Sequence, residues 1–159
     1  MAKKSGKRKA APGDIATNRQ ASFRYELIDR YEAGMQLMGS EVKSLRAGRV
    51  QLKDAYAALT PDGELWLHNV HIAPYAPASR QNHEPERPRK LLMHRREIER
   101  LIGKTKEKGL TLIPTRLYFK DRHAKVEIHL ARGKDVGDKR QTIKERELKR
   151  EMDRALRDR

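Results

Sequence analysis

The histidines are the side chains in this sequence with the chemistry for metal binding or acid–base catalysis. His83, His94, His123 and His129 lack the HExxH or HxH spacing, beside a carboxylate, that a metal site requires. Cysteine is absent, and there is no Gly-x-Ser-x-Gly motif for a nucleophile. The sequence therefore predicts no catalytic residue, no metal site and no cofactor, and we interpret the histidines as surface or nucleic-acid-facing residues.

Positive charge is the strongest chemical signal of the chain. Its 37 lysines and arginines exceed its 22 acidic residues and give a net charge of +15. Such an excess favours a polyanionic partner, because each neutralised phosphate releases counterions. The sequence has no apolar run near the length of a membrane span, so nucleic acid is favoured over a membrane.

Several basic residues are placed where they could contact phosphates. Lys43 and Arg46 are three apart on a predicted short helix and could reach the same phosphate. A basic cluster containing Arg89 and Lys90 precedes an apolar run, and Lys125 lies in a predicted strand. We expect these five residues to bind the nucleic-acid backbone, which positions a protein without specifying a sequence.

Alternating apolar residues predict the elements that must hold these side chains. Strands are expected over 22–37, with a slip near 28–30, and over 50–59, 65–72, 110–119 and 124–130. Helices are expected over 15–21, 41–47 and 91–101, and a long loop over 73–90. Many short strands with few helices indicate a mainly β protein, a small barrel flanked by short helices with an aliphatic core.

Composition divides the chain into three parts. Residues 1–13 are expected to be a disordered basic N-terminus, 14–132 an RNA-binding barrel, and 133–159 a basic tail. The tail has only a narrow apolar stripe, so we expect it to be disordered when free and helical when bound. No apolar segment follows the basic N-terminus, which argues against a signal peptide and, with the absence of cysteine, favours the cytoplasm.

Ordered motifs along most of the chain resemble the SsrA-binding protein (small protein B) family. The resemblance begins near Ile15 and reaches Leu148. Its motifs are Asn18, the block Tyr31–Asp54, Arg87-Pro88-Arg89-Lys90-Leu91-Leu92-Met93-His94, Arg95-Arg96-Glu97-Ile98, Lys125-Val126, Ala131-Arg132-Gly133-Lys134 and Asp138-Lys139-Arg140-x-x-Ile143-Lys144-x-Arg146.

The resemblance implies an oligonucleotide-binding (OB) type of barrel and a non-catalytic adaptor. Members of the family bind the tRNA-like domain of transfer-messenger RNA and bring it to stalled ribosomes for trans-translation. The tail enters the vacant decoding centre of the small subunit and the messenger channel, and the nascent peptide is tagged. Elongation factor Tu and alanyl-tRNA synthetase are implied as indirect partners, and no membrane is involved.

The resemblance also implies roles for individual residues. Positions tied to RNA binding in the family are Glu32, Leu92, His94 and Lys125, although many members have asparagine at the position of His94. The tail motif that acts on the ribosome corresponds to Gly133, Lys134, Asp138, Lys139, Arg140, Ile143, Lys144 and Arg146. This chain has Gly137 where the family often has histidine, so a stacking contact by that histidine is not expected here.

Two other functions fit parts of the sequence. A structural ribosomal protein with a basic extension has the same composition, and would stay on a ribosomal subunit through high-salt washing. An RNA-processing enzyme would require a convergent acid–base or metal site and would lose cleavage when His94 or His123 is replaced.

Overall fold

Three long antiparallel strands form the frame of the molecule. The computed structural model describes residues 13–106, 109–134 and 136–157. Strands β2 (Tyr25–Met35), β8 (Leu110–Lys120) and β9 (His123–Gly133) have eleven residues each. Strand β9 pairs with both of the others along most of its length. The predicted slip is confirmed as an irregularity in the β2–β9 register between Leu27 and Asp29.

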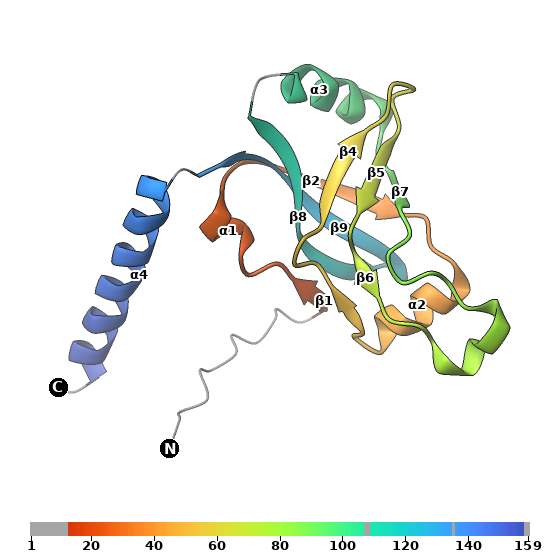
Figure 1. Ribbon diagram of the computed structural model, residues 1–159, viewed down its shortest axis with the longest axis horizontal. Helices are drawn as coiled ribbons and strands as arrows, with labels where there is room; N and C mark the ends of the chain where they lie inside the picture. Colours follow the sequence, from red (N-terminus) through yellow and green to blue (C-terminus); the bar gives the residue numbers. More distant parts are fainter. Residues whose placement is uncertain (1–12, 107–108, 135, 158–159) are drawn as a thin grey trace.

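Three shorter strands close this frame into a barrel. They are β4 (Tyr56–Leu59), β5 (Leu65–His68) and β7 (Arg89–Leu92). The pairing order is β8, β4, β5, β7, β2, β9 and back to β8 (Figure 1). Strand β1 (Asp14–Thr17) adds to the edge of β8. The fold is therefore the predicted mainly β barrel of the OB type, in which closure protects the strand edges.

Short helices and one small ribbon cover the barrel. The helices are α1 (Ala21–Arg24), α2 (Gly39–Arg46), the 3-10 helix η1 (Ala76–Gln81) and α3 (Arg95–Thr105). Strands β3 (Val50–Gln51) and β6 (His71–Ile72) pair separately from the barrel. Helices α2 and α3 lie at different ends of the barrel (Figure 1).

Helix α2 confirms the short helix expected over 41–47. At its start, the Glu41 carboxylate accepts a hydrogen bond of 2.9 Å from the Met38 backbone N–H. At its end, Gly48 has a φ of 71° and donates to Leu45, and Arg49 donates to Ser44. These two bonds form a Schellman motif, which a glycine at this position allows.

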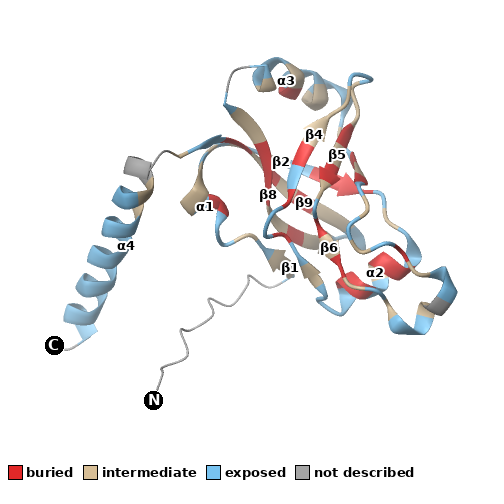
Figure 2. Cartoon of the chain, in the orientation of Figure 1, coloured by how far each residue is buried: buried red, intermediate tan, exposed pale blue. Residues whose placement is uncertain are grey.

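The core is aliphatic, as predicted. Its fully buried members are Leu, Ile, Val and Ala side chains (Figure 2). Most come from the barrel strands, joined by Leu45 of α2, Leu101 of α3, and Leu52, Val70 and Ile72 of the connecting segments and β6. All eight Phe, Trp and Tyr residues lie in the described part of the chain, and none of them is buried. The aromatic rings are therefore at or near the surface, where they can contact a ligand.

Two predicted helices are wrong in part. The segment 15–21 is not a helix: strand β1 occupies its first half, and helix α1 begins only at Ala21. Leu91 and Leu92 belong to strand β7, and the helix predicted from them begins at Arg95. Both segments gain inter-strand hydrogen bonds, β1 with β8 and β7 with both β5 and β2, and this pairing outweighs local helical spacing.

Two predicted strands are each divided in two. The segment 50–59 forms β3 and β4, and the segment 65–72 forms β5 and β6. The second break lies at Asn69, whose φ is 61°, a left-handed conformation that asparagine tolerates. The loop predicted over 73–90 contains η1 and ends as β7 begins at Arg89.

The tail forms helix α4 (Val136–Arg157), which projects from the barrel beside α1 (Figure 1). The expectation that this helix forms only on binding stays a prediction. Apart from Gly13, the predicted N-terminal segment 1–13 lies outside the described residues.

Candidate nucleic-acid interface

Strand register brings three of the predicted RNA-binding residues to one place on the barrel. Gly34 of β2 pairs with Leu92 on one side and with Lys125 on the other. A Cβ added at Gly34 would lie 3.5 Å from Leu92 Cβ and 3.7 Å from Lys125 Nζ. Glu32 lies two residues before Gly34, on the same face of β2, since side chains alternate along a strand.

Tyr118 and Lys120 complete this group, which we call the Glu32 surface: Glu32, Leu92, Tyr118, Lys120 and Lys125. The Tyr118 hydroxyl donates a hydrogen bond to Glu32 Oε2, and Lys120 Nζ lies 3.5 Å from Glu32 Oε1. No motif in the sequence singles out Tyr118 and Lys120. Recognising Asp121-Arg122 as a two-residue hairpin turn would have placed Tyr118 opposite Lys125.

Hydrogen bonding keeps the Glu32 carboxylate ionised. The bond from Tyr118, with the charges of Lys120 and Lys125, outweighs burial and lowers the pKa of Glu32 below its ordinary value. Burial, assisted by the bond to Glu32, raises the pKa of Tyr118 to about 12, so its hydroxyl stays a donor. The Glu32 side chain is 40% exposed and can also accept hydrogen bonds from a ligand.

The Glu32 surface combines three kinds of contact that RNA recognition uses. A carboxylate accepts hydrogen bonds from base amino groups and 2′-hydroxyls, and lysines contact phosphates. Leu92 adds an apolar side chain that is 53% exposed. A base or sugar face could cover this leucine, which water now contacts.

Lys90 and His94 lie close to this surface along the chain. Alternation along β7 places Lys90 on the same face as Leu92, and its Nζ pairs with Glu64 at 3.1 Å. His94 is exposed at the start of α3, two residues beyond Leu92.

Lys43 and Arg46 lie on helix α2 rather than on the strands of the Glu32 surface. Both side chains are exposed, and Lys43 Nζ is 5.3 Å from the centre of the Tyr75 ring. Their expected contact with a common phosphate stays a prediction.

The structure corrects the prediction that Arg89 binds RNA. Its side chain is 0% exposed, donates from Nε to Glu41 Oε2 at 2.5 Å, and donates from Nη1 to the Val70 carbonyl at 2.6 Å. Arg87 also donates to Glu41, from Nε at 3.0 Å and from Nη2. We call Glu41, Arg87 and Arg89 the Glu41 cluster. A phosphate cannot reach Arg89 without opening this cluster.

The Glu41 cluster attaches the end of the segment 73–90 to helix α2. Burial alone would raise the pKa of Glu41, but bonds from Met38, Arg87 and Arg89 outweigh it, and the pKa is lowered. The carboxylate is therefore ionised and paired at neutral pH.

His83 attaches the same segment nearby and corrects the expectation that every histidine is at the surface. It is buried, with Nδ1 2.9 Å from Ser40 Oγ and Nε2 2.9 Å from the Ile72 carbonyl. A carbonyl only accepts, so Nε2 donates to Ile72; in the neutral ring with this tautomer, Nδ1 accepts from the Ser40 hydroxyl. Among the described residues, no group of acidic residues and histidines is placed to hold a metal ion.

The predicted tail residues are divided between contacts with α1 and exposed positions. Gly133 ends β9 and is exposed. Lys134 donates from its backbone to the Arg24 carbonyl at 3.0 Å and from Nζ to the Ser22 carbonyl at 2.9 Å. Arg146 donates to Ser22 Oγ at 3.2 Å, and its guanidinium lies 5.7 Å from the Phe23 ring.

The other tail residues lie along helix α4. Arg140, Ile143 and Lys144 are exposed, and Lys139 is half-buried. Asp138 is within α4, but its side chain lies outside the described residues. In the described part of the chain, no helix is long and apolar enough to span a membrane.

Comparisons with known proteins agree on one family. The model of the SmpB protein family matches residues 15–158. An SsrA-binding protein of Acidothermus cellulolyticus is 58% identical over 156 residues, which cover 98% of this chain and 94% of the relative. Another, from Carboxydothermus hydrogenoformans, is 57% identical over 143 residues, covering 90% and 95%.

A solved structure gives the same result. One chain of the structure described as "tmRNA-SmpB: a journey to the center of the bacterial ribosome" is 51% identical and superposes with a TM-score of 0.64. The match covers 76% of this chain and 85% of that chain. From the matched family model and these relatives, it follows that the chain belongs to the SmpB family.

Proposed function

We propose that the protein is an RNA-binding adaptor that binds the tRNA-like domain of transfer-messenger RNA (SsrA) and delivers it to stalled ribosomes for trans-translation, ribosome rescue and peptide tagging. The family is one of RNA-binding proteins and not of enzymes, as the sequence predicted. The observation that carries the proposal is the exposed Glu32 surface, built on a chain whose relatives are called SsrA-binding proteins.

The barrel binds the RNA through the Glu32 surface. Lys125 neutralises phosphate charge, Leu92 covers an apolar face of the RNA, and Glu32 accepts hydrogen bonds that a phosphate cannot donate. The contact made by Glu32 gives selectivity, because its carboxylate repels RNA phosphates that pass too close to it. Lys90 and His94 extend this contact, and Lys43 with Arg46 supply a second basic site on α2.

The tail acts on the ribosome. Lys139, Arg140 and Lys144 present positive charge along α4, and in the proposal they contact RNA in the decoding centre and the vacant messenger channel. Elongation factor Tu and alanyl-tRNA synthetase act on the same RNA and are indirect partners. The protein works in the cytoplasm, where ribosomes translate.

Binding to the tRNA-like domain is the test of this proposal. Purified protein is titrated with that RNA in the presence of ordinary tRNA and ribosomal RNA fragments, at several salt concentrations. We expect tight binding that persists near physiological salt and resists both competitors. Equal, weak binding to every RNA that disappears with salt would leave only non-specific phosphate contacts and would favour a structural ribosomal protein.

The division between barrel and tail has its own test. Deleting residues 134–159 is expected to preserve affinity for the tRNA-like domain and to abolish tagging on stalled ribosomes. Replacing both Lys139 and Arg140 by alanine keeps the rest of the tail. This variant should also preserve affinity for the tRNA-like domain, and should reduce tagging without abolishing it. Loss of affinity for the tRNA-like domain on deletion would contradict the division.

A further inference from the structure

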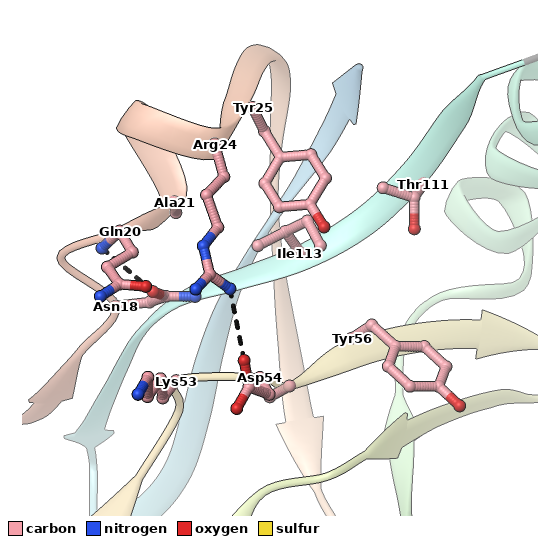
Figure 3. A pocket seen from close by; sticks show the side chains of 11 residues that line it. Asn18, Gln20, Ala21, Arg24, Tyr25, Lys53, Asp54, Tyr56, Thr111 and Ile113 are labelled. Atoms are coloured by element: carbon pink, nitrogen blue, oxygen red, sulfur yellow. Dashed lines mark hydrogen bonds and ion pairs between the residues drawn. The ribbon is translucent and has the colours of Figure 1, made fainter. Parts of the chain in front are cut away.

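A pocket of about 210 Å³ lies on the barrel beside the beginning of the tail, away from the Glu32 surface. Helix α1 and the start of β2 form one side of it, the segment 53–56 forms the other, and β8 lies behind (Figure 3). Glu32 lies seven positions after Tyr25 along β2. At roughly 3.3 Å per residue, the Cα atoms of these two residues are about 23 Å apart along the strand. One nucleotide cannot contact both.

The inner surface of the pocket suits a planar ring. Its buried lining residues are the small or aliphatic side chains Ala21, Ala55 and Ile113. Tyr25 and Tyr56 lie on its two sides (Figure 3). Tyr56 is further stacked on His68, with ring centres 5.1 Å apart, which holds its ring in place. Base–aromatic contacts of this kind are how proteins bind unstacked bases.

Charged groups at the rim offer both donors and acceptors. Arg24 Nη1 donates to Asp54 Oδ1 at 3.3 Å, and the Asp54 side chain is 67% exposed. A carboxylate can accept several hydrogen bonds, so Asp54 retains capacity for a ligand. Lys53 is exposed beside it and could contact a phosphate.

The size of the pocket limits what can occupy it. Pockets for whole drug-sized ligands have volumes of roughly 300–1,000 Å³. The smaller volume here suits one planar group of a larger molecule. In a chain with a net charge of +15, that molecule is most simply a nucleic acid.

We propose that this pocket binds the base of one unstacked RNA nucleotide that carries an exocyclic amino group, that is, adenine, cytosine or guanine rather than uracil. Asp54 accepts a hydrogen bond from the amino group, Tyr25 and Tyr56 contact the ring, and Lys53 contacts the adjoining phosphate. The proposal rests on the proposed function, because it assumes that the protein acts on RNA.

The position of the pocket connects it to the tail. The Arg24 side chain lines the pocket, while its carbonyl accepts the Lys134 backbone N–H at 3.0 Å. A base in the pocket would therefore contact Arg24, the same residue that binds the beginning of the tail. The nucleotide could belong to the tRNA-like domain or to ribosomal RNA, and the experiment separates the two sources.

The experiment maps base accessibility with and without the full-length protein. Dimethyl sulfate and kethoxal, which react at the Watson–Crick edges of adenine, cytosine and guanine, are applied to the isolated tRNA-like domain and to stalled ribosomes carrying transfer-messenger RNA. The variants are Asp54→Ala and Tyr56→Ala. Asp62→Ala, an exposed aspartate in the turn after β4, is the matched control with the same change in charge. Thermal unfolding confirms that each variant is folded.

We expect one unpaired adenine, cytosine or guanine to be protected by the wild-type chain and by Asp62→Ala, and to lose protection with Asp54→Ala and Tyr56→Ala. Changing that nucleotide to uracil should weaken the wild-type complex several-fold and leave the Asp54→Ala complex unchanged. The RNA in which the protected nucleotide is found identifies the source.

Two failures can be told apart. If the wild-type chain binds the tRNA-like domain selectively, but no nucleotide in either RNA loses protection with the folded Asp54→Ala variant, the pocket proposal alone is overturned. If the wild-type chain shows no selectivity for the tRNA-like domain, the proposed function fails, and the pocket proposal fails with it.

Discussion

The Glu41 cluster and the Glu32 surface contain the same kinds of residue in opposite environments. In each, one glutamate is paired with basic residues. A hydrogen bond from Tyr118 at Glu32, and one from the Met38 backbone at Glu41, lower the glutamate pKa together with these basic residues. Glu41 and Arg89 are 0% exposed, whereas Glu32 is 40% exposed, and Lys120 and Lys125 are also solvent-accessible. Charges that are enclosed and paired hold the fold, and charges that remain accessible can exchange their partners for RNA.

Strand β7 shows how closely the two environments approach each other. Arg89 and Leu91 point into the barrel, while Lys90 and Leu92 point outward. Adjacent residues of one basic motif therefore serve different purposes, and net charge alone does not reveal which residues bind. The comparison predicts that mutations in the two regions affect different measurements.

The largest expected effect is on stability, from Glu41→Gln. This change leaves Arg89 as a buried charge without its ionic partner, and such a loss typically costs about 3–5 kcal/mol. Urea unfolding followed by circular dichroism measures it. Under conditions where the variant is folded, its affinity for the tRNA-like domain should be nearly that of the wild type. A stability change below about 1 kcal/mol, as expected of surface pairs, would remove the distinction between the two regions.

A smaller but selective effect is expected from Lys125→Ala. Loss of a charged contact with RNA costs about 1.5–3 kcal/mol, or roughly ten- to a hundredfold in affinity, when the contact is well formed. The unfolding free energy should change little, because Lys125 is on the outer face. Lys149→Ala, an exposed lysine of α4, removes the same charge and is the control. Equal losses for both variants would indicate that only net charge matters.

Tyr118→Phe tests how Glu32 is kept ionised. The hydrogen bond from Tyr118 lowers the pKa of Glu32, so the variant should have a higher pKa at Glu32. Binding that needs the ionised carboxylate is then lost at a higher pH as the solution is acidified. Affinity at neutral pH should fall only a few-fold, by about 1 kcal/mol. A pH profile identical to that of the wild type would show that Glu32 ionisation does not contribute to binding.

Acid sensitivity gives the corresponding measurement for the Glu41 cluster. The pKa of Glu41 is lower in the folded state than in the unfolded state. The ion pairs of Glu41 therefore stabilise the protein fully at pH values above the unfolded-state pKa. This stabilisation is lost as the pH falls through the folded-state pKa. Glu41→Gln should therefore show a shallower loss of stability with acidification than the wild type. Parallel stability curves for the two proteins would contradict this origin of acid sensitivity.

The smallest effect is expected from replacing Lys43 and Arg46 together. If each residue contacts a phosphate, the slope of log affinity against log salt should decrease by about 0.7–0.9 for each contact removed. Affinity measured from low to physiological salt gives this slope. An unchanged slope would show that helix α2 does not contact the RNA backbone.

The sequence predicted the barrel because its long strands alternate regularly. The segments containing β2, β8 and β9 have apolar residues at every second position, interrupted by one register shift in β2 and one in β8, and burial on one face fixes that pattern. The short segments were less predictable. Ile15 and its neighbours form a strand only because β8 offers them an edge, and this partner is about a hundred residues away along the chain.

The candidate site was predicted only in part, because the placement of its residues depends on which segments are strands. The family resemblance and the basic residues identified Glu32, Leu92 and Lys125, which the register places together. Arg89 was assigned to the surface because its segment was interpreted as a loop followed by a helix. Interpreted as a strand, the same residues would have placed Arg89 with Leu91 on the inner face.

Selective binding by the Glu32 surface is tested most directly by one competition titration. The wild-type chain and the double variant Leu92→Ala/Lys125→Ala are titrated with the tRNA-like domain at near-physiological salt, in excess ordinary tRNA. We predict that the wild-type chain stays bound to the tRNA-like domain and that the folded double variant loses this preference. A wild-type chain displaced by ordinary tRNA, or a double variant that keeps its preference, would contradict the assignment of RNA recognition to this surface.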